Sequence, residues 1–223
     1  MLEARHDQLA RQSLTFTWEV DARGLYPYVS PVSEAVLGYR MEDALQESEK
    51  RYRELSITDN LTQLYNSRYF FHQLTMEIDR VNRYQGTMTL ILLDLDDFKK
   101  YNDTYGHIKG DAVLTRLGEV IRRCLRKTDS AYRYGGEEFT VILPMTTIKD
   151  AAIIAERIRT EFKKENFSPT PGGEVTLTLS IGLGQYRTGE EMKDFVQRVD
   201  QQMYQAKNSG KDRICSEYEI SGD

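Results

Sequence analysis

Three observations predict an α/β fold for residues 58–223, of the α+β kind in which helices flank one mixed sheet. Stretches with apolar residues at helical spacing alternate with short apolar runs, in the order strand, helix, hairpin, helix, strand, helix. A Gly-Gly pair between two of these runs indicates a hairpin, which brings antiparallel strands into the sheet. Hydrophobic residues make up 39% of the 223 residues, enough for a buried core.

The elements follow from the spacing of their apolar residues. Helices are predicted where apolar residues recur every three or four positions, over 73–84, 111–125, 151–162 and 192–206. Strands are predicted over 88–93, 130–134, 139–143 and 175–183, with a short one at 213–215. The stretch 169–173 contains two prolines and two glycines and predicts a loop. Cys124 falls on the apolar face of its helix, so we expect a thiol in the core.

The first 57 residues have a different pattern. Apolar runs at 16–20 and 26–29 flank a turn sequence and predict a hairpin, followed by a short helix over 33–37. Residues 41–57 predict a charged connecting helix with a short heptad seam, in which Ser48 occupies one core position. Two interpretations of this helix stay open: a solvated connection, or a coiled-coil contact with a second copy of the chain.

Composition excludes several classes of protein. The net charge of −5 argues against a surface that binds nucleic acid polymers. The longest apolar run, 90–93, is far shorter than the roughly 20 residues that span a bilayer, and the charged N-terminus does not resemble a signal peptide. Cys124 and Cys215 predict no disulfide framework and fit a reducing compartment. We therefore expect a cytoplasmic protein, in which a nucleotide needs a local site with its own cations.

Carboxylates gather where predicted strands end. They are Asp94, Asp96 and Asp97 after the strand 88–93, and Glu137 and Glu138 beside the turn Gly135-Gly136. If the two strands are neighbours in the sheet, Asp94 and Glu137 converge, and crowded carboxylates need a cation. Hard oxygen ligands suit Mg²⁺, which takes substrate phosphates as further ligands. The alternative is that each acidic residue is merely solvated in a loop.

Two further pairs have the chemistry of nucleotide contacts. Asn102 and Asp111 flank a stretch rich in turn formers. Together an amide and a carboxylate can read a base edge, although each residue type also caps helices. Lys207 and Lys211 lie at the end of the last predicted helix, where they can hold phosphates or complement the helix dipole.

The same residues fall into motifs that follow one another along the chain. These are Asp59-x-Leu61-Thr62-x-Leu64-x-Asn66, Asp94-x-Asp96-x-Phe98-Lys99-x-x-Asn102-Asp103, Gly106-His107-x-x-Gly110-Asp111, Arg133-Tyr134-Gly135-Gly136-Glu137-Glu138-Phe139, Ser180-Ile181-Gly182 and Tyr204-x-Ala206-Lys207-x-x-Gly210-Lys211. Together they resemble the GGDEF domains of diguanylate cyclases, in the GGEEF form. The resemblance implies a nucleotidyl-cyclase, palm-like sheet over residues 58–217, followed by a tail over 218–223. Ser67 and Lys211 stand where the family commonly has Arg, and Lys211 offers only a point charge.

The resemblance also implies a reaction. Two GTP molecules, one on each subunit of a homodimer, condense into cyclic di-GMP with loss of two pyrophosphates. Asp94, Glu137 and the backbone carbonyl of Leu95 would hold Mg²⁺, for which Mn²⁺ can substitute, and Glu138 would assist the attacking 3′-hydroxyl. Asn102 and Asp111 would read the guanine. The remaining substrate contacts would come from Phe98, Lys99, Gly135, Gly136, Lys207 and Lys211.

A second site is implied on the same chain. Arg126 and Asp129 precede Gly135 at the spacing of the family's inhibitory Arg-x-x-Asp motif, with Arg157 of a neighbouring helix as partner. In the family the product binds there and holds the subunits in a non-productive arrangement. By spacing alone, an Arg–Asp pair is usually a surface ion pair that contributes little to the stability of the fold.

The N-terminal segment resembles a different family. Trp18-x-x-Asp21-x-x-Gly24, Tyr28-x-Ser30 and Leu37-Gly38-Tyr39 are similar to the opening of a PAS sensor domain. The later strands of that domain are missing, so we expect residues 1–40 to be a partial PAS-like segment without a ligand pocket.

Three other functions stay open besides the cyclase. The chain can be a catalytically silent receptor of cyclic di-GMP that uses Arg126 and Asp129, or a cyclase of altered base specificity. It can also be a structural dimerisation module, although that leaves the clustered carboxylates unexplained.

Overall fold

The computed structural model describes residues 18–19, 28–29, 46, 57–170 and 172–217, and the chain divides into two compact units, 1–57 and 58–223. In the first unit, β1 (Trp18–Glu19) pairs antiparallel with β2 (Tyr28–Val29). This pairing confirms the predicted hairpin for those four residues. The rest of the PAS-like segment, most of the predicted helix 41–57 and the tail 218–223 lie outside the described residues.

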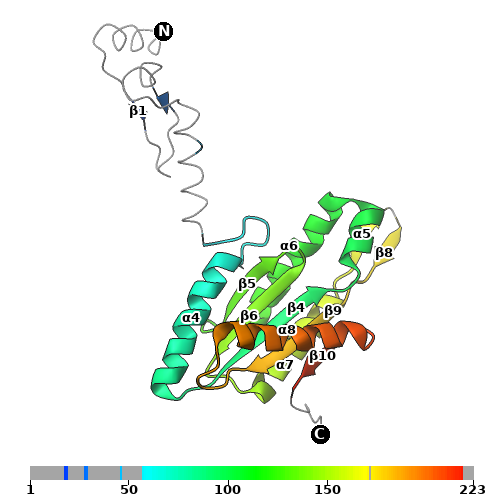
Figure 1. The fold of residues 1–223 in the computed structure, drawn as a ribbon. Coiled ribbons are helices and arrows are strands. Elements are labelled where there is room, and N and C mark those ends of the chain that lie inside the picture. The colour runs from blue at the N-terminus through cyan, green and yellow to red at the C-terminus, as the bar shows by residue number, and fades with distance from the viewer. Residues whose placement is uncertain (1–17, 20–27, 30–45, 47–56, 171, 218–223) are drawn as a thin grey trace, which may run out of the picture. The chain divides into compact units, whose positions relative to one another are not determined.

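The second unit is built on a six-stranded mixed sheet with the order β10-β9-β4-β6-β5-β3 (Figure 1). The central strand β4 (Met88–Leu95) is antiparallel to both of its neighbours, β6 (Glu138–Pro144) and β9 (Leu179–Gln185). The sheet is completed by β5 (Ser130–Gly135), β3 (Tyr65–Asn66) and β10 (Arg213–Ser216). All residues of β4 are buried, because helices cover both faces of the sheet.

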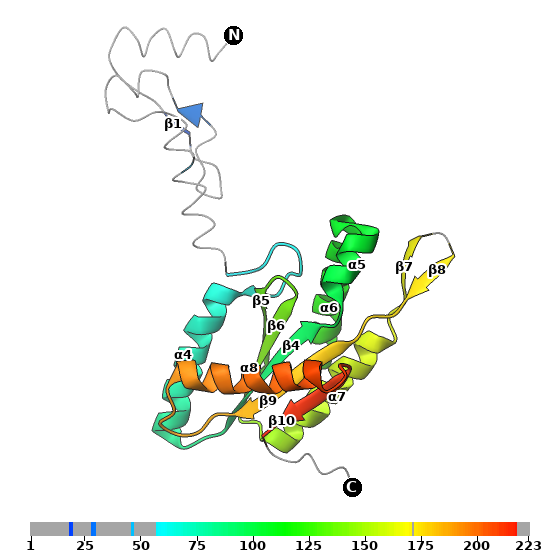
Figure 2. The ribbon, with the colours of Figure 1, turned by 45° about the vertical axis from the view of Figure 1, so that its right-hand side comes forward.

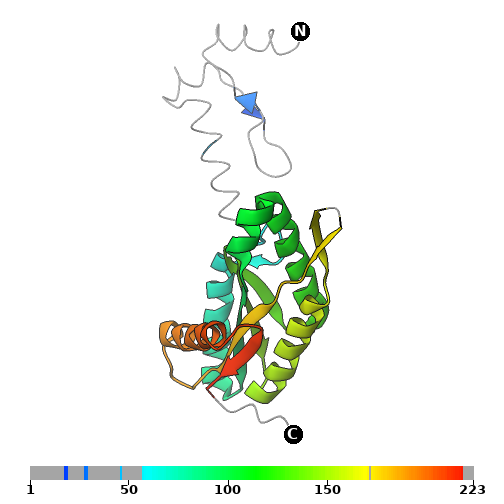
Figure 3. The same ribbon diagram turned by 90° about the vertical axis from the view of Figure 1, so that its right-hand side faces the viewer.

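The side chains of β4 alternate between two hydrophobic cores. Ile91 and Leu93 pack with α6 (His107–Cys124) and α7 (Ile148–Lys163). Leu90 and Leu92 pack with α4 (Ser67–Tyr84) and α8 (Met192–Asn208). Figures 2 and 3 show the two helix pairs on opposite faces of the sheet. The predicted fold, a mixed sheet flanked by helices, is confirmed, and so is the burial of Cys124.

Helix α8 lies unusually close to β9. A Cβ atom at Gly182 would lie 2.4 Å from the backbone nitrogen of Met203 and 2.5 Å from the carbonyl oxygen of Val199. Only glycine allows this approach of helix and strand backbones. The contact fixes the C-terminal end of α8, which carries Lys207, next to the end of β4.

The predicted strand 175–183 is wrong in extent. β8 (Gly173–Val175) pairs with β7 (Phe167–Thr170) in a separate hairpin, so most of the stretch predicted as a loop is strand. Residues 176–178 belong to no strand, and β9 begins at Leu179. The interruption has a physical cause, because Thr178 bonds Asp96 through its carbonyl and its hydroxyl.

The region between β4 and α6 also differs from the prediction. An unpredicted helix, α5 (Phe98–Tyr105), follows β4 directly, and α6 begins four residues before its predicted start. Asn102 and Asp111 therefore lie inside helices, and the alternative that they cap helices is wrong. Helix α4 begins six residues before its predicted start, with Asn66 as its N-cap. No helix among the described residues is long and apolar enough to cross a membrane.

Candidate active site

Asp94 and the two glutamates of the β5–β6 hairpin meet at one edge of the sheet. Asp94 lies near the end of β4, directly opposite Glu138 on β6 and Ser180 on β9. The backbone N–H of Leu95 donates to the carbonyl of Glu137 over 3.4 Å. The predicted convergence of these two strands is confirmed.

Asp94 is a buried carboxylate with one unsatisfied oxygen. Its Oδ2 accepts from the ammonium group of Lys207 at 2.7 Å, and its side chain is 3% exposed. Its Oδ1 is buried and has no hydrogen-bond partner among the described residues. Burial raises the pKa of Asp94, and the bond from Lys207 partly offsets this. A buried oxygen without a partner is costly, and a bound cation would satisfy it.

Glu137 and Glu138 add to the negative charge. Burial raises the pKa of both carboxyl groups, and the nearby Asp94 carboxylate raises it further, whereas Lys207 lowers it. The Asp200 carboxylate on α8 also raises the pKa of Asp94 and of Glu138. The ammonium group of Lys207 thus faces several carboxylates and cannot neutralise them all, so the edge can accept a cation.

Asp200 is a residue that sequence reasoning missed. Its position seven residues before Lys207, two helical turns away on the same face, was the available signal. Among the described residues, no group of three or more His, Cys, Asp or Glu is arranged to hold a metal by itself. Two carboxylates suit an ion that takes its other ligands from substrate phosphates and water.

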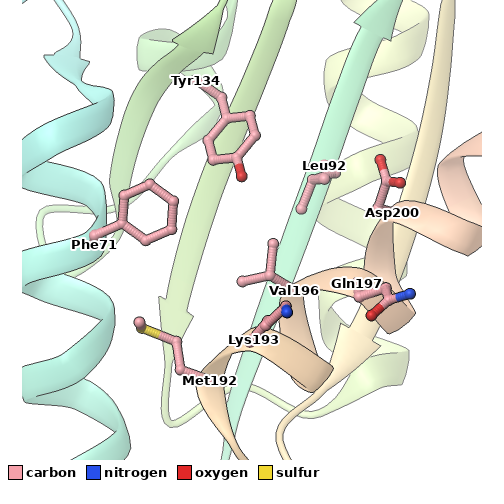
Figure 4. Close-up of a pocket in the computed structure, with 8 residues that line it drawn as sticks. All are labelled: Phe71, Leu92, Tyr134, Met192, Lys193, Val196, Gln197 and Asp200. Carbon is pink, nitrogen blue, oxygen red and sulfur yellow. The ribbon is translucent and has the colours of Figure 1, made fainter.

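A groove of about 660 Å³ lies on the sheet face between α4 and α8 (Figure 4). Its lining consists of Phe71, Leu92, Tyr134, Met192, Lys193, Val196, Gln197 and Asp200. The Tyr134 side chain points into the groove. Burial raises the pKa of its hydroxyl, and the Glu138 and Asp200 carboxylates raise it further. The groove therefore borders the carboxylate edge.

Asn102 and Asp111 come together from consecutive helices. A Cβ atom at Gly110 would lie only 1.8 Å from Asn102 Oδ1, so glycine makes room for the amide beside Asp111. Asn102 Oδ1 is buried without a hydrogen-bond partner among the described residues, while Asp111 is exposed. An amide oxygen without a partner among the described residues, next to an exposed carboxylate, can bind a polar ligand.

The two candidate phosphate lysines hold carboxylates at the end of β4. Lys207 Nζ lies 2.7 Å from Asp94 Oδ2, and Lys211 Nζ lies 2.7 Å from Asp97 Oδ1. Phe98 and Lys99 form the start of α5, where backbone N–H groups lack helical partners and favour anions. The structure therefore brings the predicted phosphate contacts to the same edge as the predicted metal ligands.

The predicted inhibitory residues gather at the C-terminal end of α6. In the turn before β5, Asp129 Oδ2 accepts from the Arg126 N–H at 2.9 Å, and the Asp129 N–H donates to the Arg126 carbonyl at 3.1 Å. Arg157 of α7 donates to the carbonyl of Cys124. The Arg126 guanidinium forms no ion pair within the described part of the chain.

The class of domain to which this fold belongs is given by a family model. The family model described as "Diguanylate cyclase, GGDEF domain" matches residues 56–213. The chain therefore belongs to the GGDEF family of diguanylate cyclases.

Similar proteins have matching names. Diguanylate cyclase A of Treponema denticola is 37% identical over 165 residues, which cover 72% of this chain and 44% of that protein. The response regulator PleD of Caulobacter vibrioides is 38% identical over 177 residues, 78% of this chain and 39% of its own length. The chain thus spans less than half the length of these two curated relatives.

Solved structures show the same domain. The GGDEF domain of DgcB from Caulobacter crescentus, in complex with c-di-GMP, is 32% identical with a TM-score of 0.70, covering 72% of this chain and 95% of that one. The active GGEEF domain of a diguanylate cyclase from Vibrio cholerae is 31% identical with a TM-score of 0.66, covering 70% and 99%.

Proposed function

We propose that the chain is a diguanylate cyclase, which condenses two GTP into cyclic di-GMP and two pyrophosphates at a site shared by two subunits. The observation that supports this most strongly is the buried Asp94, with its unpartnered oxygen, beside Glu137 and Glu138. The names of the similar proteins point the same way.

The donor set fits Mg²⁺. Asp94 and Glu137 would supply carboxylate oxygens and Leu95 its backbone carbonyl, and Mn²⁺ suits the same hard ligands. When bound, the ion neutralises charge that develops on the reacting α-phosphate. The unpartnered Oδ1 of Asp94 supports this assignment, because the protein itself provides no donor for that oxygen among the described residues.

Asn102 and Asp111 would select guanine. A guanine edge presents two neighbouring N–H groups, which a carboxylate such as Asp111 can accept together. Adenine does not offer that pair, so Asp111 favours GTP over ATP. The amide oxygen of Asn102, which has no partner among the described residues, would accept a further hydrogen bond from the base.

The triphosphate would lie against the start of α5 and the end of α8. Lys207 and Lys211 would exchange Asp94 and Asp97 for phosphate oxygens, and the N–H groups of Phe98 and Lys99 would donate to the same anion. Gly135 and Gly136 present no side chain, so that substrate can approach the hairpin backbone.

Glu138 would take the proton of the attacking 3′-hydroxyl. Because burial and Asp94 raise its pKa, Glu138 is a stronger base than an exposed glutamate. The hydroxyl belongs to the GTP of the second subunit, so a homodimer must form. The connecting helix over 41–57, which follows a partial PAS-like segment over 1–40 in the sequence, would hold the two half sites near each other.

Arg126, Asp129 and Arg157 would bind the product and inhibit the enzyme. A guanidinium group and a carboxylate suit the phosphate and guanine edge of cyclic di-GMP. Binding would release Arg157 from the carbonyl of Cys124.

The proposal is tested by incubating the full chain with GTP and Mg²⁺ and resolving the nucleotides by chromatography. We expect cyclic di-GMP to form together with two pyrophosphates per molecule, and we expect its formation to stop when the metal is chelated. When ATP is added, no adenine-containing product should form. Adenine-containing products would indicate altered base specificity. No product, together with cyclic di-GMP binding that Arg126→Ala abolishes, would indicate a receptor.

A further inference from the structure

We propose that Asp96 is a positioning residue that fixes the turn carrying Lys211 against the end of β4. The inference rests on the proposed function, because it takes Lys211 as a phosphate contact. It gives a distinct role to an aspartate that lies two residues from Asp94 and has the same chemistry.

Asp96 differs from Asp94 in its hydrogen bonds. It is 4% exposed, and both of its carboxylate oxygens are satisfied. Oδ1 accepts from the Ser180 hydroxyl at 2.6 Å, and Oδ2 accepts from the Thr178 hydroxyl at 2.6 Å and from the backbone N–H of Asp212 at 3.0 Å. These bonds satisfy the carboxylate, so Asp96 connects the end of β4 to the start of β9 and to the turn at Asp212.

The segment that Asp96 holds is a strained turn. Gly210, Lys211 and Asp212 have φ angles of +112°, +60° and +47°. Two successive non-glycine residues in this region are unfavourable and persist only where surrounding bonds hold them. The bond from the Asp212 N–H to Asp96 lies directly after Lys211 in the chain, so it acts on the backbone that aims the lysine.

The other anchors of the turn come from helices. The Lys211 N–H donates to the carbonyl of Ala206, at the end of α8. The Asp212 carboxylate pairs with Arg159 and with Lys163 of α7, the latter at 2.6 Å. Asp96 directly follows β4, the strand that carries proposed metal ligands, and it supplies a partly buried bond to this turn.

Asp97, the next residue, has a different relation to Lys211. It holds the lysine ammonium group at 2.7 Å through an exposed pair. Such a pair exchanges readily with a phosphate, whereas the buried bonds of Asp96 do not. Asp96 therefore sets the backbone of the turn, and Asp97 competes with phosphate for the side chain.

The two aspartates predict opposite effects on substrate affinity. Asp96→Asn replaces the charged carboxylate with a neutral amide that keeps one accepting oxygen, so the bond that anchors the turn weakens and the KM for GTP rises by about tenfold. Asp97→Asn removes the competing carboxylate, so the KM does not rise. GMP lacks the phosphates that Lys211 would hold, and its inhibition constant stays unchanged in both variants.

Steady-state kinetics of the full chain test this, with thermal unfolding to show that each variant folds. Asp79→Asn, at an exposed position of α4, is the matched control. In a Lys211→Ala background, Asp96→Asn should add little to the rise in KM, because both changes act on one contact. A further tenfold rise there, or an equal rise in the inhibition constant of GMP, would show a general structural role and overturn the inference.

Calorimetric titration with inorganic tripolyphosphate and Mg²⁺ makes the same comparison without turnover. Weaker binding by Asp96→Asn in a chain that makes no cyclic di-GMP would contradict the proposed function and retain the inference. Equal binding by the wild type and Asp96→Asn would overturn the inference whether or not the chain is active.

Discussion

The carboxylate edge of the sheet and the turn at Arg126 and Asp129 both contain carboxylates and basic side chains, but they differ in how fully their polar atoms are hydrogen-bonded. At the edge, Asp94 buries an oxygen that has no hydrogen-bond partner among the described residues, and so does Asn102 in α5, the helix that follows β4. In the turn, Asp129 is bonded to the backbone N–H of Arg126, and Arg157 is bonded to the carbonyl of Cys124. The edge thus offers buried acceptor atoms to a ligand, whereas the Asp129 carboxylate and Arg157 already bond to the protein backbone.

This difference shows how the two regions respond to ligands. Each unpartnered buried oxygen costs about 1–3 kcal/mol, which a bound ligand or cation can recover. The edge is therefore preorganised for binding. At the turn, a ligand that uses Arg157 or the Asp129 carboxylate must compete with the bonds that these groups already make.

The largest expected effect is at the edge. Glu137→Ala should lower cyclic di-GMP formation by about 10³-fold or more, since it removes a proposed ligand of the metal that would stabilise charge in the reaction. The variant should unfold at the same temperature as the wild type or higher, because one of several crowded carboxylates is gone. Activity and thermal unfolding are measured together, with Glu174→Ala at an exposed position of β8 as control. Retained activity would refute the assignment of Glu137.

Arg126→Ala tests the other region. It should raise the concentration of cyclic di-GMP needed for inhibition by about 10- to 100-fold, the scale of a lost charge-assisted hydrogen bond, and leave uninhibited turnover unchanged. Lys127→Ala, at the exposed neighbouring position, should do neither. Unchanged inhibition in Arg126→Ala would show that Arg126 does not bind the inhibiting product.

Arg133 connects the hairpin to the start of the domain and should have a smaller effect. Its guanidinium donates to the carbonyl of Gly136 at 2.9 and 3.1 Å and pairs with Asp59 at 3.3 Å. Arg133→Lys cannot reproduce this fork, so turnover should fall by about tenfold through misplacement of the glutamates. Asp59→Asn should act in the same direction more weakly. Equal turnover of Arg133→Lys and the wild type would show that the hairpin holds its shape without the fork.

The smallest expected effect is on stability. Folding raises the pKa of Glu138, so the folded chain binds more protons than the unfolded chain above pH about 4.5, and stability falls as the pH rises through the raised pKa. Without metal, Glu138→Gln should therefore unfold at a higher temperature than the wild type at pH 7.5, and the advantage should vanish near pH 4. Thermal scans across pH measure this, and an advantage that does not change with pH would point to packing instead.

The sequence predicts the edge of the sheet better than the elements around it. The apolar run that ends at Asp94 and the Gly-Gly turn before Glu137 are local signals, and they place both carboxylates correctly. Helix α5 escapes prediction because Asn102, Asp103 and Thr104 are weak helix formers. Burial of Phe98 and Tyr101 against the core overrides that preference.

Long-range bonds cannot be predicted from such local patterns. Asp94 and Asp96 are the same residue type in the same motif, so spacing does not distinguish their roles. The bonds that separate them come from Thr178, Ser180 and Asp212, which lie 82, 84 and 116 residues away from Asp96. Only the folded chain brings these donors to one carboxylate and leaves the other with an unpartnered oxygen.

The central claim is that the edge is half of a catalytic site and needs a second copy. It is tested most directly by measuring cyclic di-GMP formation in subunit-exchanged mixtures of the wild type and Glu137→Ala. If both half sites are required, an equal mixture should retain about one quarter of the wild-type cyclic product, because only wild-type pairs close the ring. Activity that falls in proportion to the wild-type fraction would contradict the shared site.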